Sequence, residues 1–337
     1  MQKDFHYGAV RVIAEKAGFS PKEAQVIAYS SQFVDDATEH KPLRIPQFYK
    51  QLNWSDIRFD GKYFDPICTA HKGIQFFQDF KKEVQQKIYI PFHFIPPEPF
   101  NNQKKYSYIT KPNSNFSRIL VNRALKFLQK RRSVKNLIRL GIALHTYMDT
   151  WSHQDFSGIL SYKDNNIDKI EIYDGKTLKK ITSIERIKNS LLPPIGHAQA
   201  YDYPDLPFLI WSYVKASSPN KRILRNNPQI FYKAGKHLFE ILCKFNKCQN
   251  SWNDIKEKFW LAVNYINHDE NERLDFFKRI FKEINFFYNE KLWKNDILNP
   301  PSFTDKSIRI KRNTCWFLFH KAALEQRLFV IEHIKQL

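Results

Sequence analysis

The sequence has little glycine, few cysteines and no long apolar run. Its 337 residues include 9 glycines and 4 cysteines, against 29 phenylalanines. Scarce glycine and long periodic segments disfavour a sheet fold with tight turns and favour helices. No run of about 18 apolar residues occurs, so we expect no membrane-spanning helix. The first residues, "MQKDFHYGAV", lack the apolar core of a signal peptide, which predicts a cytoplasmic protein unless it is exported by a non-classical route.

The cysteines are too few and too irregularly spaced to define a scaffold. Cys68, Cys243, Cys248 and Cys315 form neither a CxxC pair nor a disulfide framework. We therefore expect free thiols in a reducing compartment.

Acidic residues are also in short supply. The chain has 54 Lys and Arg but 34 Asp and Glu, which gives a net charge of +20. Such a balance attracts nucleic acid, anionic lipid heads or phosphorylated substrates. The basic residues are spread along the whole chain, however, and no zinc finger, aromatic RNA-binding signature or basic zipper is present. Charge alone therefore supports an anionic partner only weakly, and nothing in it indicates the oligomeric state.

The periodic segments predict a mainly α fold: a single large helical domain over residues 1–337, built as a multi-helix bundle with long Pro-rich loops. Residues 1–215 carry the site motifs, and helices in 216–337 should pack on the same core. One or two small β-hairpins are expected, at Asp60-Gly61 and at Asp174-Gly175. The Pro-rich stretch 90–100 should not be helical. Helices are expected at 4–17, 20–37, near 69–87, 117–153 with a break at 131–133, 227–246, 251–266, 269–290 and 313–335.

One stretch, "GIALHTYMDTWSHQDFSG", places three ionisable residues in an apolar helix. His145, Asp149 and His153 are four residues apart, and each such step drifts only about 40° around a helix, so they share one stripe. Burying them is costly unless a metal ion or a hydrogen-bond network satisfies them. Each residue alone could be structural: a core histidine bonded to a carbonyl, a capping aspartate, a histidine at the helix end. Three in register favour ligands of zinc or another divalent metal.

Other His and Asp residues extend this candidate site. We expect one or two divalent ions, with zinc as the first candidate, and Asp35 or Asp36 as the carboxylate that accepts a proton from water. His71, His93, Asp202 and Asp205 are candidates for orienting the ligands or contacting the substrate. The expected metal ligands are His6, Asp36, His145, Asp149, His153 and His197.

Several motifs together resemble a known family. They are "MQKDFHYGAVRVIAEKAGFSPKEAQVIAYSSQFVDDAT", "ICTAHKGI", "PFHFIPP", "GIALHTYMDTWSHQDFSG" and "IGHAQAYDYPDLP". In this order, up to about residue 215, they resemble a bacterial family of unknown function, domain of unknown function 6765. That family implies no activity.

A more distant similarity is to the helical superfamily of zinc-dependent phospholipases C and single-strand nucleases. Those enzymes hold zinc with a His-x-x-x-Asp helix, which His145 and Asp149 match. Their N-terminal Trp ligand, whose free amine binds metal, is absent here, and His153 lies closer than their next His. The resemblance therefore implies a one- or two-metal hydrolase. Its substrate would be an anionic phosphoester, whether small molecule, lipid or nucleic acid, attracted by a basic rim.

Two further hypotheses stay open at this point. The His and Asp residues could form a buried structural network in a non-catalytic helical protein. Alternatively, the +20 charge could serve a binder of nucleic acid or anionic surfaces, whose association would be sensitive to salt.

Overall fold

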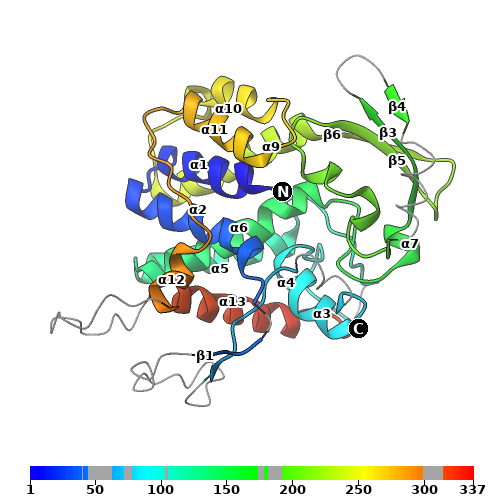
Figure 1. The fold of residues 1–337 in the computed structure, drawn as a ribbon, viewed down its shortest axis with the longest axis horizontal. Coiled ribbons are helices and arrows are strands. Elements are labelled where there is room, and N and C mark those ends of the chain that lie inside the picture. Colours follow the sequence, from blue (N-terminus) through cyan, green and yellow to red (C-terminus); the bar gives the residue numbers. More distant parts are fainter. Residues whose placement is uncertain are drawn as a thin grey trace.

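The computed structural model describes residues 1–39, 41–44, 63–71, 78–102, 105–173, 178–180, 192–298 and 314–337. In the described part the fold is mainly α, as predicted (Figure 1). The helices are η1 (Asp4–Ala9), α1 (Val10–Lys16), α2 (Pro21–Asp36), α3 (Lys82–Val84), η4 (Gln85–Tyr89), α4 (Ile90–Phe92), α5 (Asn115–Lys130), α6 (Val134–Ser152), α7 (Tyr162–Asn165), η5 (Ala198–Ala200), η6 (Tyr203–Asp205), α9 (Asn227–Asn246), η7 (Trp252–Asp254), α10 (Lys256–Val263), α11 (Glu270–Ile280), α12 (Leu292–Leu298) and α13 (Cys315–Glu332). The strands are β1 (Leu43–Arg44), β2 (Tyr63–Phe64), β3 (Ile167–Tyr173), β4 (Leu178–Lys180), β5 (Ile210–Lys215) and β6 (Arg222–Asn226).

The first two helical segments form the predicted pair. The π-helical η1 continues directly into α1, and Gly18 then adopts a φ of +90°, which a residue without a Cβ tolerates. The next helix, α2, starts with the predicted capping box: the Ser20 side chain accepts a hydrogen bond from the Glu23 backbone, and the Glu23 side chain accepts one from the Ser20 backbone. This pair brings the chain start and the end of α2 to α6.

The central helix is α6. It is separated from α5 by residues 131–133, where the break was predicted, and its residues from Asn136 to Ser152 are all buried. Helices α2, α5 and α13 surround it (Figure 1). The contact with α2 is so close that a Cβ on Gly141 would lie 2.0 Å from Ser30 Oγ. This close approach sets Asp35 of α2 beside His145 of α6.

The Pro-rich stretch corrects one prediction. The helix expected near residues 69–87 is described from Lys82 onward, and it continues through Pro91 to Phe92. A proline ring inside an α-helix clashes with the carbonyl one turn earlier. Here five π-helical residues, Gln85–Tyr89, precede Pro91 and widen that turn. His93 then ends the helix as its C-cap, which fixes the direction in which its side chain leaves.

The β structure is larger than predicted. The strands of the second expected hairpin, β3 and β4, pair, although the turn at Asp174-Gly175 lies outside the described residues. Strands β5 and β6 extend them into a four-stranded antiparallel sheet of order β4-β3-β5-β6. Its apolar residues, among them Trp211 and Tyr213, pack against the Phe156 segment. The first hairpin turn, at Asp60-Gly61, lies outside the described residues, although the flanking strands β1 and β2 pair. The sheet lies at one end of the helices (Figure 1).

The C-terminal helices pack against the N-terminal ones. Helix α9 has the predicted bounds, while α10 and α11 are shorter than predicted and α12 was not expected. A buried ion pair, Arg273 Nε to Asp4 Oδ2 at 2.9 Å, joins α11 to η1. One apolar cluster contains residues from Met1 to Ile334.

A disulfide at the end of α9 bears on the predicted compartment of the protein. Cys243 and Cys248 form a disulfide, so the expectation of free thiols is wrong for them. The reason is local: α9 ends at Asn246, Lys247 adopts a left-handed φ of 53°, and the chain turns back until the two Cα atoms are 5.0 Å apart. Disulfides are typical of oxidising compartments, so this one does not support the predicted cytoplasmic location, which stays a prediction.

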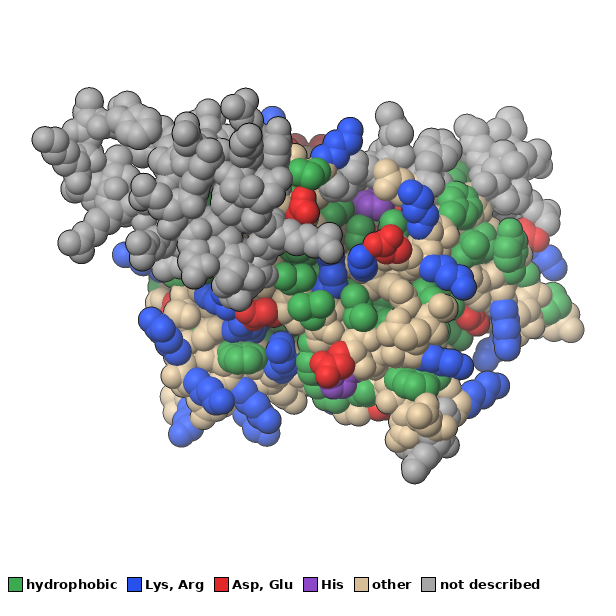
Figure 2. Space-filling view, turned by 90° about the horizontal axis from the view of Figure 1, so that it is seen from below, with side chains coloured by type: hydrophobic (Ala, Val, Ile, Leu, Met, Phe, Trp, Pro, Cys, Tyr) green, Lys and Arg blue, Asp and Glu red, His purple; other side chains and the backbone are tan. Residues whose placement is uncertain are grey.

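The described helices include none that is long and apolar enough to cross a membrane. Lys and Arg side chains are scattered over the face in Figure 2, between acidic and apolar ones. On that face the excess charge is spread out, as the even distribution of Lys and Arg along the sequence suggested.

Candidate metal centre

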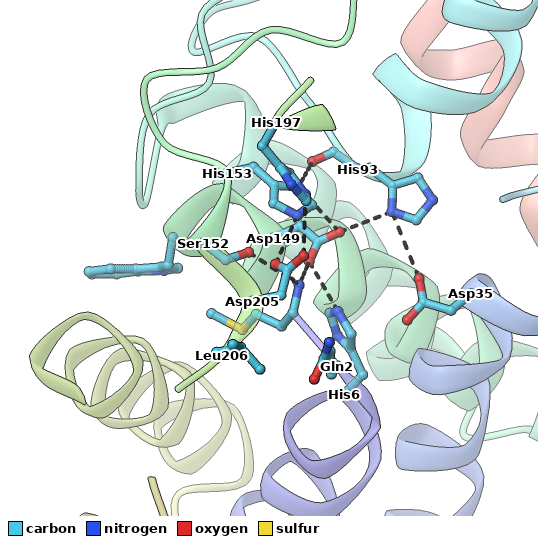
Figure 3. A network of polar contacts seen from close by, with 12 residues as sticks. Gln2, His6, Asp35, His93, Asp149, Ser152, His153, His197, Asp205 and Leu206 are labelled. Atoms are coloured by element: carbon cyan, nitrogen blue, oxygen red, sulfur yellow. Dashed lines mark hydrogen bonds and ion pairs between the residues drawn. The ribbon is translucent and has the colours of Figure 1, made fainter. Parts of the chain in front are cut away.

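His and Asp side chains from separate elements meet beside the C-terminal half of α6 (Figure 3). Helix α6 supplies two of them and its C-cap a third. The others come from η1, α2, the C-cap of α4, the N-cap of η5, and η6. These side chains are His145, Asp149, His153, His6, Asp35, His93, His197 and Asp205. The stripe predicted on α6 therefore faces partners from both sides.

Asp149 is at the middle of this cluster and is 1% exposed. Its Oδ1 lies 2.8 Å from the Met1 ammonium nitrogen and 3.0 Å from His6 Nε2. Its Oδ2 lies 3.0 Å from His93 Nδ1 and 3.2 Å from His145 Nε2. Burial alone would raise the pKa of Asp149, but the positive charges of His153, the N-terminus and the other histidines hold it well below its usual value. Asp149 is therefore a carboxylate surrounded by nitrogen atoms.

Four histidine rings of the cluster are held in the same way. One ring nitrogen of each faces a backbone carbonyl, which only accepts hydrogen bonds, so that nitrogen carries the hydrogen. The four bonds run from His145 Nδ1 to Ser31 O (2.9 Å), His93 Nε2 to Thr69 O (2.9 Å), His153 Nδ1 to His93 O (3.0 Å) and His197 Nδ1 to Tyr201 O (2.6 Å). The other nitrogen of each ring points into the cluster. A histidine that ligates a metal is characteristically held by such a bond from its second nitrogen.

The inward nitrogens are close to other acceptors. His145 Nε2 and His93 Nδ1 are 3.2 Å apart, and His153 Nε2 and His197 Nε2 are each 3.2 Å from an oxygen of Asp205. In neutral rings these nitrogens carry lone pairs, which repel one another and the carboxylates unless a proton or a cation lies between them. Two ligands of a tetrahedral zinc ion, each about 2.0–2.1 Å from it, are about 3.3 Å apart. The observed separations match that spacing.

Three groups of ligand atoms could each hold an ion, with all atoms of a group within 4.8 Å of one another. The groups are His6/His145/Asp149, Asp35/His93/His145 and His153/His197/Asp205. The first two share His145, whose Nε2 has one lone pair and binds one metal. In these described residues, the histidines therefore allow one ion near His145 and a second near Asp205.

The N-terminal ammonium lies between these two positions. Its nitrogen is fully buried, 2.8 Å from both Asp149 Oδ1 and Asp205 Oδ1 and 3.2 Å from Ser152 Oγ. Burial lowers its pKa, but the neighbouring Asp149, Asp205 and Asp35 outweigh burial and raise the pKa to about 11. Two carboxylates of the cluster thus already share a cation. Sequence reasoning missed this group, because the signal sought was an N-terminal Trp.

Other groups in the cluster are shifted in different directions. Burial raises the pKa of Asp35 to about 6, and it lowers the pKa of His6 well below its usual value. His6 Nδ1 is a buried atom with no hydrogen-bond partner among the described residues. Asp35 is the most exposed carboxylate of the cluster, at 24% against 12% for Asp205 and 2% for the Asp149 side chain. Water therefore reaches Asp35 first.

Not every predicted residue joins the cluster. Asp36 accepts hydrogen bonds from Tyr288 Oη and from Gln32 Nε2, and it lies in none of the three ligand groups. Asp202 is exposed, and its carbonyl accepts the Asp205 backbone N–H. His93 and Asp205, expected as supporting residues, lie in groups of ligand atoms that could hold an ion. Their Pro-rich surroundings gave no indication of which ring or carboxylate edge would face the site.

A pocket of about 340 Å³ opens onto the cluster. Its walls include Asp149, His93 and His153, together with Lys3 from the chain start and Glu270 from α11. Six Asp and Glu residues line it against one Lys and the Met1 ammonium, and Lys3 Nζ is paired with Glu270 at 3.2 Å. The described wall is therefore acidic, unlike the basic rim expected from the net charge.

Comparison with known proteins places the whole chain in one family. The model of the Family of unknown function (DUF6765) matches residues 1–334. No curated protein and no solved structure gave a match.

Proposed function

We propose that this chain, which belongs to the DUF6765 family, is a metal-dependent hydrolase of phosphoesters. The observation that carries the proposal is the orientation of four histidine rings, each held by a carbonyl on one side and directed at acceptors on the other. The inward nitrogens lie 3.2 Å from one another or from an oxygen of Asp205, a separation that a proton or a metal ion can bridge. That arrangement is favourable around a shared cation.

The donor set suits zinc, which binds imidazole nitrogen and carboxylate oxygen in tetrahedral sites. One ion would be held by His145 and Asp149 with His6 or His93, and a second by His153, His197 and Asp205. When bound, the metal supplies positive charge that acidifies water and offsets charge on a phosphoryl oxygen. Asp35, at 3.6 Å from His145 Nε2 and partly exposed, would accept the proton of that water.

The acidity of the pocket bears on the choice of substrate. An anionic phosphoester would be repelled by six carboxylates, and both cations in the described lining, the Met1 ammonium and Lys3, are already paired with carboxylates. Its binding therefore requires the positive charge of the metal, and we expect substrate affinity to disappear when the metal is removed. The +20 net charge, which is spread over the surface, would contribute long-range attraction that falls with salt.

The first experiment is elemental analysis of tag-free protein that has not met a chelator, followed by assay on phosphodiesters. His145→Gln is the test variant, and His320→Gln is its matched control. Both histidines are fully buried, but His320 of α13 lies outside the three ligand groups, and its Nδ1 accepts the Ile67 backbone N–H. We expect one or two equivalents of metal in the wild type and in His320→Gln, and a loss of at least one equivalent in His145→Gln.

Two results would overturn the proposal. A wild-type protein that stays metal-free after incubation with zinc, manganese and iron would leave only the structural network. A metal-loaded protein without phosphodiesterase activity would keep the metal centre and refute the hydrolase.

A further inference from the structure

His71 lies in the same pocket but outside the three ligand groups. It lines the wall together with Tyr89, His93 and Phe94. No group of ligand atoms in the described residues includes it. The pocket therefore contains one imidazole that the metal centre does not use.

This imidazole is held by a carboxylate of its own. His71 Nδ1 is 2.6 Å from Asp79 Oδ1, and the two side chains are 3% and 1% exposed. The second oxygen, Asp79 Oδ2, accepts a hydrogen bond from Tyr89 Oη at 2.7 Å. The carbonyl of Asp79 accepts another from Gln85 Nε2 at 2.9 Å, which fixes the turn that carries the carboxylate.

The direction of these bonds determines what His71 can do. Asp79 accepts from the Tyr89 hydroxyl through one oxygen, and its other oxygen takes the N–H of His71 Nδ1. No hydrogen bond joins His71 Nε2 to a described residue. Within the described residues the ring is thus fixed by a carboxylate at Nδ1, and Nε2 is the nitrogen that a proton transfer would use. A base oriented by a third group is the arrangement that enzymes use for proton transfer.

We propose that His71 donates a proton to the leaving oxygen of the phosphoester, and that Asp79 and Tyr89 position its ring. This role rests on the proposed hydrolase function and adds to it a general acid for the leaving oxygen. The bond between water oxygen and phosphorus forms while the bond from phosphorus to the leaving oxygen breaks. Asp35 takes a proton from the water, and Nε2 of His71 gives one to the leaving oxygen. Exchange of one proton with solvent at each residue restores the starting state.

The test compares two methyl phosphodiesters that differ only in the leaving group, p-nitrophenoxide or phenoxide. A nitrophenoxide carries its negative charge well and needs little help from an acid, whereas phenoxide needs more. General acids contribute on the order of 100-fold or more to such steps. We expect His71→Gln to lower kcat on the phenyl ester by about 100-fold and on the nitrophenyl ester by less than about 5-fold. Metal content should equal that of the wild type.

Two variants complete the design. Asp79→Asn should lower kcat selectively on the phenyl ester as well, but by a smaller factor, because the His71 ring stays in place and its carboxylate partner becomes an amide. His268→Gln, an exposed histidine outside the pocket, is the control and should match the wild type on both esters. Equal losses of His71→Gln on both esters, or no loss, would refute the role of His71 while leaving the hydrolase intact. A wild type inactive on both esters would instead refute the proposed function, and this role with it.

Discussion

Substituting Asp149 by Asn should strongly destabilise the metal-free protein. The change keeps the shape of the side chain and removes its charge. Asp149 is 1% exposed and has four nitrogen atoms within 3.2 Å of its carboxylate oxygens. Removing one partner of a buried ion pair costs about 3–5 kcal/mol, because the remaining charge stays buried without compensation. The Met1 ammonium keeps Asp205 at 2.8 Å as a second partner. We therefore expect the lower end of that range, about 3 kcal/mol.

The assay is urea unfolding in the presence of a chelator. With an m-value of about 3 kcal/mol/M, the midpoint should fall by about 1 M. Asp155→Asn is the control: this side chain is 45% exposed, its partner Arg225 is 4.0 Å away, and such pairs contribute about 0–1 kcal/mol. Added zinc should then raise the midpoint of the wild type by more than that of Asp149→Asn, because the variant keeps the ligands of the second ion but loses Asp149 from those of the first, and a ligand stabilises only the state that binds it. A midpoint within about 0.3 M of the wild type would refute the buried ion pair.

Three further changes test other parts of the structure. The pKa of Asp35 is raised to about 6, so the native state binds more protons than the unfolded state between pH 4 and 6. The free energy of unfolding therefore falls as pH rises through that window. Asp35→Asn should remove this fall and stabilise the metal-free protein at pH 7 by about 1–2 kcal/mol, measured by urea titration. Gly141→Ala should lower the free energy of unfolding by about 3 kcal/mol or more and reduce metal content, because its Cβ would lie 2.3 Å from the Ile27 carbonyl oxygen. An unchanged melting curve would contradict the close contact of α2 and α6. Cys243→Ser should lower the free energy of unfolding by about 2 kcal/mol, because it removes the disulfide that closes the short Cys243–Cys248 loop. Thiol titration of the denatured wild type should find two fewer thiols before reduction than after it.

Much of the helical framework could be predicted because it depends on local signals. Ser20, Pro21 and Glu23 mark the start of α2, and "RRS" at 131–133 marks the break between α5 and α6. The helix through Pro91 could not be predicted, since it requires a π-helical stretch that the surrounding packing selects. Strands β5 and β6 were missed for a similar reason. The strand character of β5 depends on pairing with β3, which lies some forty residues earlier in the chain, and that of β6 depends on pairing with β5.

The candidate site divides in the same way. The spacing of His145, Asp149 and His153 is local, and the structure places all three in the cluster. The roles of Asp36 and Asp205 were harder to assign, because each depends on which carboxylate edge faces inward. Neighbouring Asp35 and Asp36 point to different partners, one toward the histidines and the other toward Tyr288. A one-residue step on a helix turns the side chain by about 100°, and only the packing of α2 on α6 decides which of the two faces the site.

The origin of the ligands also decides how metal binding should affect stability. His6, Asp35, His93 and His197 come from segments that are far apart in the sequence and meet only in the folded chain. An unfolded chain offers at most the i, i+4 pairs of the α6 segment, so metal binds the native state with strong preference. At a free zinc concentration 100 times the Kd, binding adds about 2.7 kcal/mol to the free energy of unfolding. Because the ligands join η1, α2, α4 and α6, this gain should appear with the same midpoint in probes of every helix, whereas a metal bound to α6 alone would protect that helix selectively.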